Sequence, residues 1–89
     1  MKEEIKNKQA PPTEAQIREE EKRVRHLRRL VDFSMALIAQ SGIPREEALR
    51  LVEAVRKQAY RMFPDKKETF ELIYTPRFRR LIAEKYELQ

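Results

Sequence analysis

The sequence predicts an all-α protein: a long N-terminal helix, an antiparallel second helix, and short third and fourth helices that close a small bundle. Two long stretches carry apolar residues at the three- and four-residue spacing of a helix face. A Ser-Gly-Ile-Pro segment at residues 41–44 separates these stretches, and no stretch shows the two-residue alternation of a strand. A chain of 89 residues has room for one domain.

A polar tail, residues 1–12, precedes this domain, which covers residues 13–89. The tail has one large apolar residue, Ile5, and ends in two prolines. Such a segment cannot bury enough apolar surface to offset the entropy that it loses on ordering, so we expect it to be disordered. Thr13 followed by Gln16 matches a capping box and marks the start of the first helix.

The first helix is expected to run from Glu14 to Gln40. On a helical wheel, its apolar residues between positions 24 and 38 cover an arc of about 200°, twice the width that a surface helix needs. Its own chain should therefore leave part of the arc uncovered. The residues that widen the arc are Leu30, Phe33 and Leu37.

The N-terminal turns of this helix carry little of the core. Ile17 is the only large apolar residue between Thr13 and Val24. Charged pairs four residues apart support these turns locally, each contributing about 0.3 kcal/mol. We expect the turns to project beyond the bundle.

The corner at residues 41–44 joins the first helix to the second. Gly42 is the only glycine, and it stands where a helix end favours a residue that can adopt positive φ. Pro44 suits the first turn of the next helix, because no N–H is needed there. These features predict an αα-hairpin.

The second helix should extend from Pro44 to about Phe63, because Pro64 disfavours helical geometry in the residue before it. Its apolar face includes two alanines, Ala48 and Ala59. Small residues on that face should allow the first helix to approach closely.

The last quarter is predicted to form two short helices that act as one bent arm. Asp65 and Glu68 fit a second capping box, at the start of a helix that ends near Tyr74. Thr75 then suits an N-cap and Pro76 the first helical position of a final helix that continues to about residue 87.

The composition excludes several kinds of catalytic site. Cysteine is absent, which removes disulfides, thiolate metal sites and cysteine nucleophiles. One glycine cannot form a glycine-rich phosphate loop, and neither Ser34 nor Ser41 has the glycine pattern of a nucleophile motif. The only histidine, His26, has Arg23 three residues before it, where a di-metal helical bundle has glutamate. We expect no enzyme activity, no metal and no cofactor.

No stretch is long and apolar enough for a transmembrane helix, and the first residues lack the apolar segment of a signal peptide. Together with the absence of cysteine, this favours a soluble, cytoplasmic protein with no membrane partner.

Positive charge is the strongest polar feature, with 20 Lys and Arg residues against 15 Asp and Glu and a net charge of +5. Five bases and no acid fall within residues 22–29, and three arginines fall within residues 77–80. Such clusters can contact phosphates, although charge runs on helices are more often simply solvated. The residues that would contact nucleic acid are Lys22, Arg25, Arg28, Arg29, Arg77 and Arg80.

Two functions from different classes fit this sequence. The leading hypothesis is a small non-catalytic helical protein–protein interaction module that forms a homodimer, because the apolar arc of the first helix is wider than one chain should cover. The alternative is a nucleic-acid-binding protein that uses the basic faces Lys22–Arg29 and Arg77–Arg80. The apolar residues expected to contact a second copy or another protein are Leu30, Phe33, Leu37, Tyr60 and Tyr74.

Overall fold

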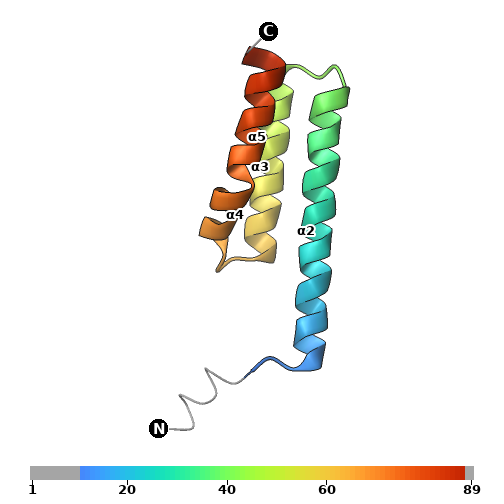
Figure 1. Cartoon of the computed structure of the whole chain (residues 1–89), viewed down its shortest axis with the longest axis vertical. Helices are drawn as coiled ribbons and strands as arrows, with labels where there is room; N and C mark the ends of the chain where they lie inside the picture. The colour runs from blue at the N-terminus through green and yellow to red at the C-terminus, as the bar shows by residue number, and fades with distance from the viewer. Residues whose placement is uncertain (1–10, 88–89) are drawn as a thin grey trace.

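The computed structural model describes residues 11–87, within which it contains helices and no strand, and it confirms the all-α class. The elements are α2 (Glu14–Gln40), α3 (Arg45–Met62), α4 (Lys67–Ile73), α5 (Thr75–Ile82) and a π-helical turn, η1 (Ala83–Glu87). Figure 1 shows α3 running antiparallel to α2, while α4, α5 and η1 return beside α3 as one broken arm. Residues 1–10 of the expected disordered tail lie outside the described residues.

The capping box at the start of α2 forms as predicted. The Thr13 backbone N–H donates to Gln16 Oε1 at 2.9 Å, and the Gln16 backbone N–H donates to Thr13 Oγ1 at 3.1 Å. The residues from Thr13 to Glu19 are all exposed, and the first buried residue of α2 is Leu27. The first turns of α2 therefore extend beyond the rest of the bundle, as Figure 1 shows.

The prediction of positive φ at Gly42 is wrong. The chain leaves α2 through Ser41 in an extended conformation (φ −98°, ψ 166°), so this corner needs no left-handed residue. Lys85 Nζ donates to Ala39 O, one of the last carbonyls of α2, at 3.0 Å and to Ser41 O, just beyond the helix, at 2.8 Å. A lysine near the end of the chain takes the place of a glycine cap.

The second helix has Pro44 as its N-cap residue and ends one residue before Phe63. Its buried residues include Ala48 and Ala59, as expected from their place on the apolar face. Pro64 follows directly and lies in the turn to α4.

The two capping patterns predicted in the last quarter do not form. Lys66 is the N-cap residue of α4 and no side chain caps that end, because Asp65 lies in the preceding turn. Tyr74 keeps right-handed helical geometry (φ −100°, ψ −33°), so Thr75 is already helical and cannot be an N-cap, which requires a non-helical backbone. The Thr75 hydroxyl instead donates to Glu71 Oε1 at 2.8 Å.

A single hydrophobic core joins the helices. Phe78, Ile38 and Val31 are its largest fully buried apolar side chains. The end of the chain is tied to the α2–α3 corner, because the Tyr86 hydroxyl donates to Ile43 O at 2.9 Å. The buried hydrophobic residues are Leu27, Val31, Ile38, Ala48, Val55, Ala59, Phe70, Phe78 and Ile82.

Candidate functional site

Two of the three predicted contact residues of α2 lie at the surface. Phe33 is 65% exposed and Leu37 is 38% exposed, whereas Leu30 is half-buried and packs against the core. The three residues follow the helical spacing i, i+3, i+7 and therefore share one face. We call this face, formed by Leu30, Phe33 and Leu37, the α2 strip.

The predicted contact residues Tyr60 and Tyr74 form a separate group around Phe70. The ring centroid of Tyr60 lies 6.2 Å from that of Phe70, edge to face, and that of Tyr74 lies at 5.3 Å. The Tyr60 hydroxyl donates to Glu71, a hydrogen bond that raises the pKa of Tyr60 and lowers the pKa of Glu71. Both tyrosines are half-buried and already engaged within the chain.

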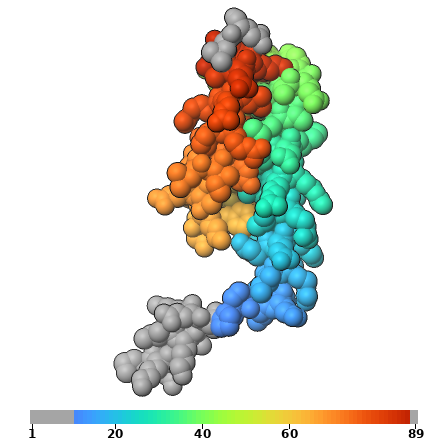
Figure 2. Space-filling view, viewed as in Figure 1, coloured from blue at the N-terminus to red at the C-terminus, as the bar shows by residue number. Residues whose placement is uncertain are grey.

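A first groove borders the projecting part of α2. It has a volume of about 650 Å³ and lies between the first turns of α2 and the turn that joins α3 to α4. Figure 2 shows these first turns of α2, in blue, standing clear of the rest of the bundle. We call it the outer groove; its apolar lining consists of Pro12, Ile17, Met62, Phe63 and Pro64.

A second groove continues from the first, between α2 and α4. We call it the inner groove; it has a volume of about 270 Å³ and shares Glu20, Phe63 and Lys66 with the outer groove. Lys66 Nζ lies 3.6 Å from Glu20 Oε2, so an ion pair stands where the grooves meet. The other residues that line the inner groove include Val24, Leu27, Arg28, Phe70, Ile73 and Tyr74.

The six basic residues predicted to contact nucleic acid are all exposed, and none forms an ion pair with another described residue. Arg28 lines the inner groove together with Tyr74. Arg77 Cζ lies 5.8 Å from the centroid of the Tyr74 ring. Tyr74 thus lies near an arginine of the second predicted basic cluster and lines one groove with an arginine of the first.

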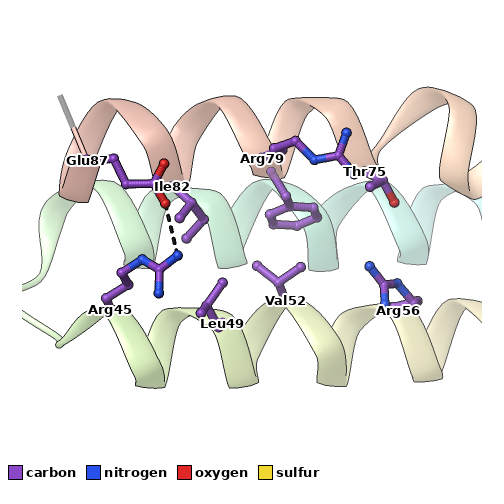
Figure 3. Close-up of a pocket in the computed structure, with 9 residues that line it drawn as sticks. Arg45, Leu49, Val52, Arg56, Thr75, Arg79, Ile82 and Glu87 are labelled. Atoms are coloured by element: carbon purple, nitrogen blue, oxygen red, sulfur yellow. Dashed lines mark hydrogen bonds and ion pairs between the residues drawn. The ribbon is translucent and has the colours of Figure 1, made fainter.

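A third pocket, of about 210 Å³, lies between α3 and α5. Figure 3 shows Leu49, Val52 and Ile82 between the two helices, with arginines around them. Arg45 pairs with Glu87 at 3.0 Å, and Arg56 pairs with Glu53 at 2.8 Å. The pocket contains three arginines, of which the third is Arg79. The first two are therefore already paired with carboxylates within the chain.

Within residues 11–87, the candidate metal ligands form no cluster, and His26 lies among bases. No group of three or more His, Asp or Glu side chains in this part of the chain is placed to hold a metal ion. His26 is exposed, and three of its four helical neighbours at i±3 and i±4 are the bases Lys22, Arg23 and Arg29. No carboxylate on its own helix can orient the ring as a general base requires.

Two groove residues, Ile17 and Ile73, are missing from the residues predicted to make contacts. Ile17 is 43% exposed and Ile73 is 50% exposed. The seven-residue spacing between Ile17 and Val24 is a signal in the sequence that could have identified the first. No local pattern identifies Ile73, because its position beside α2 depends on how α4 packs.

Comparison of the chain with protein-family models, with curated proteins and with solved structures gives no match. Within the described residues, no helix is long and apolar enough to cross a membrane.

Proposed function

We propose that this protein is a small, cytoplasmic, non-catalytic helical interaction module that forms a homodimer. The observation that supports the proposal is the apolar surface that the chain leaves uncovered along α2. Ile17, Phe33 and Leu37 are 43%, 65% and 38% exposed. Phe33 and Leu37 lie together on the α2 strip and Ile17 lies on another face, in the projecting turns; adjoining exposed apolar residues mark interaction sites more often than residues scattered singly do.

The size of the core favours the same proposal. In the described part of the chain, nine buried hydrophobic side chains form the core, and two of these are alanines. A domain of this size buries a small fraction of its surface, so association with a second copy adds apolar burial that one chain lacks.

Sedimentation equilibrium of the full chain at tens of micromolar tests the homodimer. The expected species has twice the 10.8 kDa mass of one chain. A purely monomeric protein at these concentrations contradicts the proposal.

The alternative is nucleic-acid binding, and two observations favour it: Arg77 lies near the Tyr74 ring, and Arg28 lines one groove with Tyr74. Two cations beside an aromatic ring could contact a phosphate and a stacked base of a single strand. This alternative predicts binding to single-stranded RNA or DNA that weakens steeply as salt rises, because neutralised phosphates release counterions.

A double variant, Arg28→Ala with Arg77→Ala, tests the alternative. Its affinity for a single-stranded oligonucleotide should fall. The slope of the logarithm of affinity against the logarithm of salt concentration should decrease in magnitude by about two. Arg50→Ala with Lys57→Ala is the matched control, since both side chains are exposed on α3. Absence of binding by the unmodified protein in dilute salt removes the alternative.

A further inference from the structure

We propose that the two copies pair through the N-terminal halves of α2, in antiparallel orientation, with Ile17 of each copy seated in the inner groove of the other. This inference rests on the homodimer proposed above and assigns its interface. The argument uses the charges of α2, the exposure of its first turns and the shape of the inner groove.

Charge divides the first part of α2 into two blocks. Residues 13–21, the acidic block, contain four glutamates and one arginine, whereas residues 22–29, the basic block, contain five bases and no acid. The helix dipole favours acids only within the first turn, so it does not account for the glutamates at positions 19–21. An antiparallel pair of α2 helices places each acidic block beside the basic block of the other copy, whereas a parallel pair places like charges together.

The acidic block has few partners in its own chain. Its residues from Thr13 to Glu19 are exposed, and Figure 1 shows these turns beyond the bundle. Of its glutamates, only Glu20 forms an ion pair with another described residue, at 2.9 Å from Arg23 and 3.6 Å from Lys66. The remaining glutamates form no ion pair with residues 11–87 of their own chain, and bases of a second copy can pair with them.

The inner groove has the size and lining to accept an apolar side chain. Its volume of about 270 Å³ lies below the range of about 300–1,000 Å³ typical of pockets for drug-sized ligands, and suits one or two side chains. Its walls are largely apolar and aromatic, and they include Arg28 and Lys66 as cations. Ile17 is exposed and has Glu14 and Glu21 at i−3 and i+4, which places an isoleucine between two carboxylates on one helix face.

A simple register brings these surfaces together. If position 17 lies level with position 28 of the second copy, the two-fold axis passes between Lys22 and Arg23. Both copies then make the same contact, as a closed dimer requires. The two positions are about 16 Å apart along one helix, so Ile17 reaches the inner groove while the glutamates at 19–21 come level with residues 24–26.

The ion pairs and the apolar contacts contribute differently to the free energy of dimerisation. Exposed ion pairs are each worth about 0.2–1 kcal/mol and are screened by salt, so they mainly select the antiparallel orientation. Burial of Ile17 against groove residues such as Ile73 supplies the affinity. The dimer should therefore weaken, without being abolished, as salt rises.

A charge-exchange experiment with the full chain tests the interface. The acid-reversed variant carries Glu14→Lys and Glu21→Lys, which flank Ile17 on one helix face, and the base-reversed variant carries Arg25→Glu and Arg28→Glu. All four residues are exposed, so both variants should fold, which circular dichroism checks. Each variant alone should dimerise at least about tenfold more weakly, because like charges then face each other. An equimolar mixture should restore a species of two chains, since opposite charges again meet.

Two further variants separate this interface from the α2 strip. Ile17→Asp should dissociate the dimer, whereas Phe33→Glu should leave it intact. Glu47→Lys with Arg50→Glu is the matched control for charge reversal, because both residues are exposed on α3. This control should leave the dimer unchanged.

The possible failures are distinguishable. A monomeric unmodified protein overturns both the homodimer and its interface. A dimer that survives both charge reversals, or reversed variants whose mixture stays monomeric, overturns the interface alone. If Phe33→Glu dissociates that dimer, the homodimer proposal stands, but the α2 strip is its interface.

Discussion

Lys85 Nζ lies 2.8 Å from the backbone oxygen of Ser41, so a side chain of η1 caps the C-terminal end of α2. The same amino group lies 3.0 Å from Ala39 O. The next residue, Tyr86, donates its hydroxyl to Ile43 O at 2.9 Å. Two consecutive residues near the end of the chain thus hold the corner between the two long helices.

Replacement of Lys85 by methionine tests this cap. The substitution keeps an apolar stem and removes the donor. The free energy of unfolding should fall by about 1–2 kcal/mol, towards the low end of the range of about 1.5–3 kcal/mol for hydrogen bonds from charged groups, because Lys85 is only half-buried. Urea unfolding measures the change. Lys57→Met, at an exposed position of α3, is the control. An equal loss in the two variants contradicts a capping role for Lys85.

The hydrogen bond between Tyr60 and Glu71 predicts a dependence of stability on pH. The fold lowers the pKa of Glu71 from 4.5, so its contribution is present above pH 4.5 and is lost as the pH falls through the lowered value. The fold raises the pKa of Tyr60 from 10.0, so its contribution is present below pH 10.0 and is lost as the pH rises through the raised value.

Tyr60→Phe should therefore reduce the melting temperature near neutral pH, and the difference from the unmodified protein should shrink in acid. Thermal melts followed by circular dichroism measure it. Tyr86→Phe is the control, because its acceptor, Ile43 O, does not titrate. Its effect should persist at acid pH, and parallel behaviour of the two variants would argue against the carboxylate as the cause.

Ala48 is fully buried on α3, and a larger side chain has no space there. Ala48→Leu should lower the free energy of unfolding by about 1–3 kcal/mol through overpacking. Ala54→Leu introduces the same side chain at an exposed position of the same helix and should change stability by about 0.5 kcal/mol or less. Chemical unfolding of the two variants checks the expected contrast.

Thr13 caps turns of α2 that contain no buried residue. Thr13→Ala should weaken these turns by about 1 kcal/mol, which corresponds to about fivefold faster hydrogen exchange of their amides. Global unfolding should change little, because the turns lie outside the core. Hydrogen exchange in dilute, monomeric solution measures the effect, with Thr69→Ala, whose side chain caps no helix end, as the control. Equal exchange rates in the unmodified and Thr13→Ala proteins would show that the cap is dispensable.

Much of the fold follows from local patterns. The start of α2 is fixed by the reciprocal hydrogen bonds of Thr13 and Gln16, which involve neighbours in sequence only. Three capping predictions are wrong: those at Gly42 and Asp65 concern chain reversals, and the one at Thr75 concerns the break within the arm. At each of them the backbone geometry depends on how α4, α5 and η1 pack against the two long helices.

Some features of the candidate site likewise follow from local sequence patterns, and others depend on the tertiary structure. The exposed Phe33 and the charge blocks of α2 follow from periodicity and residue order, because a helix fixes which side chains share a face. Arg77 lies near Tyr74 because the two are only three residues apart, whereas the position of Tyr74 with Arg28 in one groove joins residues about 46 positions apart. For residues this far apart in sequence to line one groove, the arm formed by α4, α5 and η1 must fold back against α2. No pattern in a single segment specifies this packing.

By itself, the sequence determined the helices, their apolar faces and the acidic and basic blocks of α2. These are local properties, set by backbone geometry and by the spacing of side chains along one helix. Only the tertiary structure decided that Lys85 caps α2, that Ile73 lines one groove with Val24, and that a second groove borders the projecting turns. Each of these depends on contacts between segments that are distant in sequence, and packing against the common core selects them.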